Sequence, residues 1–171
     1  MSGIFGMNIK MAIYGESHGK SIGVVLDGLP PGLSLDEAAI AAEMARRAPG
    51  QNALSTARKE SDMVEIQSGF FNGFTTGTPL CARIVNSDQH SKDYSILADK
   101  MRPGHADYAG HVRYQGFNDY RGGGHFSGRL TAPLVFAGAV AKQALAQYGI
   151  IVGSHILQIN DMIEILRYGK P

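Results

Sequence analysis

Short apolar runs alternate with glycine-rich breaks along this chain of 171 residues. The run Ser21–Asp27 (SIGVVLD) is β-branched and apolar, and the stretch before it, from Asn8 to Tyr14, alternates moderately between apolar and polar positions. Both patterns predict strands, because successive side chains of a strand point to opposite faces of a sheet. The same reasoning predicts three further strands, over Met63–Phe71, Leu80–Asn86 and Ile150–Ile159.

Three segments have the composition of helices. Ala38–Arg47 is rich in helix formers and follows SLDE at 34–37, which matches a capping box that begins at Ser34. Thr131–Tyr148 is Ala-rich and apolar nearly all round, which predicts a buried helix, and residues 105–116 predict a shorter one. Helices mixed with strands that are adjacent in sequence favour antiparallel pairing. We therefore expect the α+β class.

The polar stretch from Asn86 to Gly104 predicts a long loop, and loops of this length inside a compact domain tend to be functional. Residues 1–171 have the length of a single domain.

Composition excludes several classes of protein. A formal net charge of +1 leaves no excess of basic residues for a phosphate backbone, so we expect no nucleic-acid partner. Cys81 is the only cysteine and lies in an apolar run, which predicts a buried structural thiol and no disulfide framework. No apolar stretch approaches the roughly 18 residues of a membrane span, and the N-terminus lacks a signal-peptide pattern. We therefore expect a cytoplasmic protein with no membrane partner.

The segment YGESHGKS, at 14–21, contains parts of two familiar motifs. GESHG at 15–19 matches a nucleophile elbow, but that motif needs a helix after the turn, and a β-branched run follows here. GKS at 19–21 ends like a phosphate-binding loop, but Tyr14 stands where that loop needs glycine. What remains is a turn whose glycines let the backbone approach a ligand, with the hydroxyl of Ser17 and the imidazole of His18 available for chemistry.

A second histidine lies in a similar setting. RPGHADY, at 102–108, puts His105 beside Arg102 and Asp107 at the predicted start of a helix, whose N-terminus favours anions. An imidazole can give or take a proton near neutral pH, so His18 and His105 are both candidates for general acid–base chemistry. The structural alternative is that His105 only caps the helix.

The third candidate segment is DYRGGGHFSGR, at 119–129. A glycine-rich loop that leads into a long helix can cradle a phosphate or another anion through its backbone N–H groups. Arg121 and Arg129 flank the loop, and guanidinium groups bind carboxylate or phosphate in a bidentate manner. Arg46 and Arg47 end the first predicted helix, where a solvated capping role is the simpler interpretation.

Together these segments resemble the chorismate synthase family, in order and with similar spacing, from about residue 8 to about residue 150. The resemblance does not depend on a single motif. The matching segments are GESHG at 15–19, VVLDGLPPG at 24–32, RRAPGQ at 46–51, SGFFNGFTTGTP at 68–79, NSDQ at 86–89, SKDY at 91–94, RPGHADY at 102–108 and DYRGGG at 119–124.

The resemblance implies a lyase of the shikimate pathway. Such an enzyme converts 5-enolpyruvylshikimate 3-phosphate into chorismate by a 1,4-anti elimination of phosphate, which requires reduced FMN without net redox change. It further implies a homotetramer whose subunit is a β-α-β sandwich, with antiparallel sheets around a helical layer. Some members also reduce the flavin with NADPH.

Roles for individual residues follow from their positions in the resemblance. His18 would protonate the departing phosphate, and His105 would lie by the flavin and protonate its reduced form. Ligands of the substrate phosphate and carboxylates would be Ser17, Arg47, Arg102 and Arg129. The FMN-contacting stretch would be His125, Phe126 and Ser127, and Arg47 matches a position that the family uses for NADPH.

The chain departs from the family pattern in two respects. HFSGRLT, at 125–131, stands where the family usually has Arg-Ser-Ser-Ala-Arg-Glu-Thr, and Ala53 replaces an arginine, which weakens the nucleotide assignment. Family chains also run much further and carry an Arg-Ser-Asp motif in their C-terminal half. We therefore expect 171 residues to be the N-terminal part of one chorismate synthase-like domain, with little or no turnover by itself.

Two other functions are compatible with the same residues. One is a metal-dependent hydrolase that uses Glu16, His18, His105, Asp107 and His111, although their spacings match no standard zinc pattern. The other is a fragment that binds flavin or an anion without catalysis. We expect no metal in the family's reaction.

Overall fold

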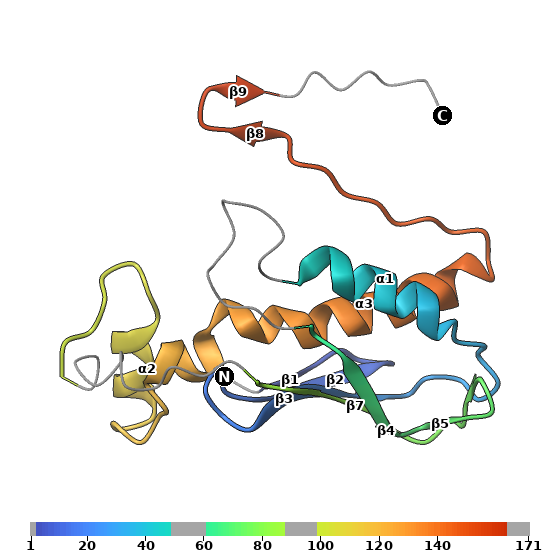
Figure 1. The fold of residues 1–171 in the computed structure, drawn as a ribbon, viewed down its shortest axis with the longest axis horizontal. Coiled ribbons are helices and arrows are strands. Elements are labelled where there is room, and N and C mark those ends of the chain that lie inside the picture. The colour runs from blue at the N-terminus through green and yellow to red at the C-terminus, as the bar shows by residue number, and fades with distance from the viewer. Residues whose placement is uncertain (1–2, 49–60, 88–98, 164–171) are drawn as a thin grey trace.

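The computed structural model describes residues 3–48, 61–87 and 99–163. Its main feature is a five-stranded antiparallel sheet in the order β1-β2-β3-β7-β4 (Figure 1). The strands are β1 (Ile4–Phe5), β2 (Lys10–Gly15), β3 (Ser21–Asp27), β7 (Leu80–Val85) and β4 (Val64–Ser68).

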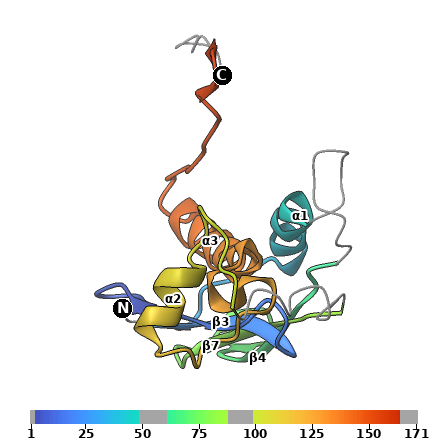
Figure 2. The same ribbon diagram turned by 90° about the vertical axis from the view of Figure 1, so that its left-hand side faces the viewer.

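Two long helices cover one face of this sheet, as Figures 1 and 2 show from perpendicular directions. They are α1 (Glu37–Arg47) and α3 (Thr131–Ala146), which pack against each other. The remaining described elements are short: α2 (Asp107–Arg113), the 3-10 turns η2 (Arg121–Phe126) and η3 (Gly128–Leu130), and the paired strands β5 (Phe70–Phe71) with β6 (Phe74–Thr75) and β8 (Gln158–Ile159) with β9 (Met162–Ile163).

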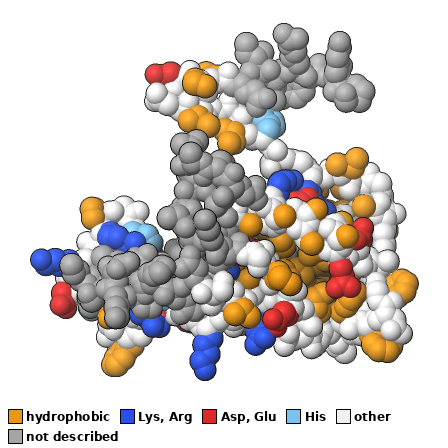
Figure 3. Space-filling model, in the orientation of Figure 1, with side chains coloured by type: hydrophobic (Ala, Val, Ile, Leu, Met, Phe, Trp, Pro, Cys, Tyr) orange, Lys and Arg blue, Asp and Glu red, His pale blue; other side chains and the backbone are white. Residues whose placement is uncertain are grey.

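The core lies between the central strands and the helical layer. Ile22, Val24 and Leu26 alternate along β3 and are almost completely buried, because every second side chain faces the helices. Their partners across β7 are equally buried, and α3 adds Phe136 to the same cluster. A hollow of about 250 Å³ remains between α1 and β4, and Figure 3 shows its hydrophobic lining.

The segments that carry candidate site residues gather at one end of the sheet. β2 and β3 are joined by the turn at 16–20, and Ser21 at the start of β3 pairs with Val85 at the end of β7. Asn86, directly after β7, therefore lies beside that turn. The glycine-rich turn η2, which precedes α3 in the chain, also lies against the turn between β2 and β3.

Most of the predicted elements are confirmed. The predicted strand Ser21–Asp27 is β3, the strands from Asn8 and Leu80 are β2 and β7 within two residues, and the buried helix is α3. The antiparallel pairing and the α+β class are confirmed as well. Of the predicted loop at 86–104, residues 88–98 lie outside the described part of the chain.

Three details of the prediction were wrong. α1 is capped by Asp36, whose carboxylate accepts hydrogen bonds from the N–H groups of Ala38 and Ala39, so Ser34 does not begin a capping box. The strand predicted over 63–71 is divided at Gly69, whose φ of +81° breaks the pairing with β7. Cys81 is half-buried, because it lies on the sheet face away from the helices.

The predicted strand over Ile150–Ile159 is also wrong, apart from its last two residues, which form β8. Residues 150–163 are exposed throughout and project away from the sheet and helices (Figure 1). The apolar composition favours a strand, but among the described residues no neighbouring strand pairs with residues 150–157. A strand is stable only where its backbone groups find partners.

Truncating the centre of the core should be costly. Phe136→Ala removes a side chain with no exposed area, so the free energy of unfolding should fall by about 3–5 kcal/mol in urea titrations. Leu134→Ala, on the same helix but 39% exposed, is the control and should cost about 1 kcal/mol or less. Equal losses in the two variants would contradict this description of the core.

Candidate active site

The two candidate histidines lie against adjacent glycines of one turn. A Cβ atom added to Gly122 would be 2.5 Å from Nε2 of His18, and one added to Gly123 would be 2.8 Å from Nε2 of His105. Because consecutive Cα atoms are about 3.8 Å apart, the two Nε2 atoms are separated by at most roughly 12 Å. The structure thus brings together two imidazoles that are far apart in the sequence.

Only glycine permits this turn. Gly122, Gly123 and Gly124 have φ values of 58°, 84° and 54°, a left-handed conformation that other residues adopt with strain. A Cβ at Gly124 would also lie 1.9 Å from the carbonyl oxygen of Asp119. Any larger residue at 122 or 123 would occupy the space of an imidazole, so the absence of side chains here creates room for the two rings.

Hydrogen bonds join this turn to the turn between β2 and β3. The N–H of Ser17 donates to the carbonyl of Gly124 at 3.0 Å, and Nδ1 of His125 donates to the carbonyl of Gly15 at 2.8 Å. Both Ser17 and His18 are buried. The backbone directly before His18 is therefore held against the glycine-rich turn.

Asn86 connects the β2–β3 turn to a buried arginine. Its Nδ2 donates to the carbonyls of Glu16 and Gly19 at 3.1 and 2.9 Å, while its Oδ1 accepts from Nε of Arg129 at 3.1 Å. Asn86 is 6% exposed, so these bonds form away from water. The buried amide satisfies two turn carbonyls and orients one guanidinium group at the same time.

Two candidate anion ligands share one buried carboxylate. Asp62 accepts from Nη1 of Arg47 at 2.5 Å with one oxygen and from Nη1 of Arg129 with the other. The Asp62 side chain has no exposed area, and those of Arg47 and Arg129 are 20% and 3% exposed. Two guanidinium groups and one carboxylate leave a net charge of +1 in a poorly hydrated place, which favours a further anion.

A second acidic residue organises the segment around His105. Asp107 accepts from Nε of Arg102 at 2.8 Å, from Nη2 at 3.0 Å and from the Arg102 N–H at 3.1 Å, and it lies 2.5 Å from Nδ1 of His105. Side-chain hydrogen bonds from Arg102 hold the pKa of Asp107 well below its usual range, although burial opposes this shift. Asp107 therefore remains a carboxylate.

The remaining charged pair of the turn is Asp119 with Arg121. Arg121 donates from Nε and Nη2 to the two carboxylate oxygens at 2.9 and 2.7 Å. This bidentate contact lowers the pKa of Asp119 and raises that of Arg121. Arg121 is thus committed to its neighbour at the start of the glycine-rich turn.

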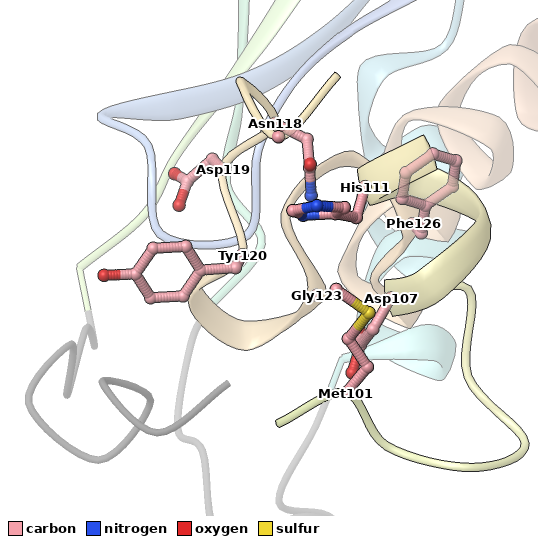
Figure 4. A pocket seen from close by; sticks show the side chains of 9 residues that line it. Met101, Asp107, His111, Asn118, Asp119, Tyr120, Gly123 and Phe126 are labelled. Carbon is pink, nitrogen blue, oxygen red and sulfur yellow. The ribbon is translucent and has the colours of Figure 1, made fainter. Parts of the chain in front are cut away.

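A cavity of about 110 Å³ lies between α2 and the glycine-rich turn. Figure 4 shows Asp119 and Tyr120 on one side of it and His111 and Phe126 on the other. Phe126 also packs on Gly110 of α2, where an added Cβ would be 2.6 Å from the ring. Pockets for drug-sized ligands measure about 300–1,000 Å³, so this cavity is too small for a flavin.

The sequence-based candidates fall into two groups around the turn. Ser17, His18 and His105 meet there, while Arg47 and Arg129 join at Asp62. Of the three residues predicted to contact FMN, His125 is bound to Gly15, Phe126 packs on α2, and the hydroxyl of Ser127 accepts from the N–H of Arg129.

Sequence reasoning missed two residues of the site, Asp62 and Asn86. Asp62 follows a polar segment that shows no pattern, and its φ of +50° is apparent only in the fold. Asn86 stood within the resemblance, but nothing in the sequence indicated its contact with Arg129. As for the metal-dependent alternative, no group of three His, Cys, Asp or Glu side chains suited to an ion is found among the described residues.

Comparison with known proteins identifies the family. The sequence model of the chorismate synthase family matches residues 9–170. The chain is 52% identical over 164 residues to chorismate synthase of Sulfurimonas denitrificans and 48% identical over 162 residues to that of Cytophaga hutchinsonii. These matches cover 96% and 95% of this chain but 45% of either relative.

A solved chorismate synthase structure gives the same result for the fold. It superposes with a TM-score of 0.67 at 31% identity, over 92% of this chain and 40% of that chain. The chain belongs to the chorismate synthase family and spans rather less than half the length of the relatives that it matches. Within the described ranges, no helix is long and apolar enough to cross a bilayer.

The buried ion pairs should dominate the stability of this region. Asp62→Ala leaves the buried guanidinium group of Arg129 and the half-buried one of Arg47 without their shared carboxylate, so the free energy of unfolding should fall by about 3–5 kcal/mol. Glu65→Ala is the matched control, because its pair with Arg83 is nearly half exposed and should contribute about 1 kcal/mol or less. Chemical denaturation measures both, and similar losses would refute the buried cluster.

Acid should weaken the fold through Asp107. Its pKa is lowered in the folded state, so its contribution to stability is present above about pH 4, the ordinary range of an aspartate, and decreases as the pH falls further. Asp107→Asn should be less stable than the wild type at pH 7, with the difference shrinking below about pH 4. Asp27→Asn, at the exposed end of β3, is the control. A difference that does not depend on pH would contradict the ionic contact.

Proposed function

We propose that this chain provides the N-terminal part of the active site of chorismate synthase. The reaction is the 1,4-anti elimination of phosphate from 5-enolpyruvylshikimate 3-phosphate, the step of the shikimate pathway that forms chorismate. Membership of the family supports the reaction class, and the observation that carries the proposal is the position of His18 and His105 on adjacent glycines of one turn. Two imidazoles at one place suit a reaction in which one proton is delivered to a departing anion and a second proton is transferred elsewhere in the site.

His18 is the proposed acid for the departing phosphate. A phosphate leaves more easily when a proton is delivered to it, and an imidazole can carry that proton near neutral pH. His18 is 6% exposed and lies in a turn fixed by the Ser17–Gly124 hydrogen bond, so its ring needs little reorganisation. His105 is the proposed second proton carrier, at its Nε2 atom beside Gly123.

The substrate anions are proposed to bind the positive groups near these histidines. The substrate has one phosphate and two carboxylates, which require several cationic donors. The net charge of the Arg47–Asp62–Arg129 cluster supports its role, and the Ser17 hydroxyl is the proposed neutral ligand. Arg102 is proposed with them from its position in the family, although Asp107 already binds its guanidinium group.

The case for reduced FMN depends on the chemistry of the groups around the glycine-rich turn. The nearby cavity is too small to hold a flavin. The imidazoles and guanidinium groups around the glycine-rich turn suit an anionic flavin, because their positive charge favours an anion. We propose that residues 125–127 hold the flavin, and that Arg47 takes part if NADPH is the reductant. When bound, the flavin would supply transient electron donation with no net redox change.

We further propose a homotetramer in the cytoplasm, with no nucleic acid or membrane as a partner. Residues 150–163 support such an association, because many of their apolar side chains are exposed to solvent. Since the chain spans under half of its relatives' length, it should turn over little or no substrate by itself.

Catalysis can be tested by supplying the missing length. We expect little phosphate release from the 171-residue chain, and release in the presence of reduced FMN when it is fused to the C-terminal part of the Sulfurimonas denitrificans enzyme. In that fusion, His18→Asn and His105→Asn should each lower kcat by about 10²–10⁴-fold. His155→Asn, in the exposed segment, is the control and should not change kcat.

Each result has a distinct interpretation. An inactive fusion whose unfused chain still binds reduced FMN would favour a non-catalytic flavin-binding fragment. Activity that is lost on chelation would favour the metal-dependent alternative. Full activity of both histidine variants would refute the proposed roles.

A further inference from the structure

The contacts of His105 differ sharply between its two ring nitrogens. Nδ1 lies 2.5 Å from Oδ1 of Asp107, whereas Nε2 faces Gly123 on the side of the glycine-rich turn. The His105 side chain is 28% exposed and that of Asp107 is 8% exposed. The carboxylate contact is thus shielded from water, and the ring has one nitrogen turned toward the proposed reaction site.

Asp107 and Arg102 place opposite demands on Nδ1. A carboxylate only accepts hydrogen bonds, so it requires a proton on Nδ1, whereas a guanidinium only donates and would require a lone pair there. Nη2 of Arg102 is 3.3 Å from Nδ1 but 3.0 Å from Oδ1 of Asp107, so it has a closer acceptor. The shorter, charge-assisted contact with Asp107 therefore decides the tautomer.

Asp107 can act in this way only while it is ionised. Arg102 ensures this with two side-chain hydrogen bonds and one from its backbone N–H. Across the turn, the other titratable groups are His18 beside Gly122 and the Asp119–Arg121 pair, which is already neutralised internally. Among these described groups, only Asp107 offers an acceptor within hydrogen-bond reach of Nδ1.

We propose that Asp107 is a positioning residue that fixes neutral His105 with its proton on Nδ1, so that Nε2 is the atom that takes up and delivers a proton. Arg102 supports this role through its hydrogen bonds to the Asp107 carboxylate, and its role as a direct ligand of substrate is secondary. The tautomer follows from contacts in the chain itself. Only the use made of the proton at Nε2 rests on the proposed function.

The tautomer can be measured on the unmodified chain without substrate or flavin. With ¹⁵N-labelled histidine, long-range ¹H–¹⁵N spectra at about pH 8.5, well above the ordinary titration of imidazole, distinguish a protonated ring nitrogen from an unprotonated one. We expect His105 to carry its proton on Nδ1. The exposed His155 provides a reference in the same spectrum. A wild-type His105 with its proton on Nε2 would overturn the proposal.

Variants separate the carboxylate from general effects on the fold. Asp107→Asn should lower the ratio of the Nδ1–H to the Nε2–H tautomer by at least about tenfold, toward that of His155, because a carboxamide can donate as well as accept. Asp107→Glu should restore part of the preference. An unchanged ratio in Asp107→Asn would contradict the proposal.

Arg102→Gln gives a second test that does not depend on the folding of Asp107→Asn. It leaves the carboxylate in place, so the Nδ1–H tautomer should persist, and its loss would show that the arginine sets the tautomer. The result is independent of the proposed reaction. If His105 carries its proton on Nδ1 but the fusion is inactive, the proposed function alone is refuted. If the fusion is active but His105 carries its proton on Nε2, the positioning role alone is refuted.

Discussion

The close contact between the glycine-rich turn and the turn after β2 is the constraint on which the site depends. Gly122, Gly123 and Gly124 adopt a left-handed conformation, and the carbonyl of Gly124 accepts the N–H of Ser17. The space that a side chain would take at the first two positions is filled by imidazoles from elsewhere in the chain. Backbone geometry at three residues therefore brings together groups that are separated by almost ninety positions in the sequence.

Charge is handled in the same region by pairing each buried or half-buried arginine with an aspartate. Asp62 joins Arg47 to Arg129, Asp107 binds Arg102, and Asp119 binds Arg121. Pairing offsets the cost of removing these ions from water and fixes where each guanidinium group lies. Since Asp62 serves two arginines, the region keeps an excess of positive charge, which is the property that a multiply anionic substrate requires.

The sheet and α3 form the scaffold that positions these parts. β3 and β7 run antiparallel at the centre of the sheet, so the turn before β3 and Asn86 after β7 lie at the same end. α3 packs its buried face on these strands and begins two residues after Arg129. The same fold is found in a solved chorismate synthase, which superposes over 92% of this chain.

Local patterns in the sequence determined the central elements and pointed to the chemistry. Alternation and apolar runs predicted β3, β7 and α3, because burial of one face follows directly from side-chain periodicity. Clustered glycines with His18 and His105 indicated the turns that carry the site. Tertiary structure alone decided that Asp62 bridges two arginines, that Asp107 holds Nδ1 of His105, and that residues 150–157 form no strand. Each of these depends on which groups meet across the fold, since ion pairs, tautomers and strand pairing need partners that no local pattern specifies.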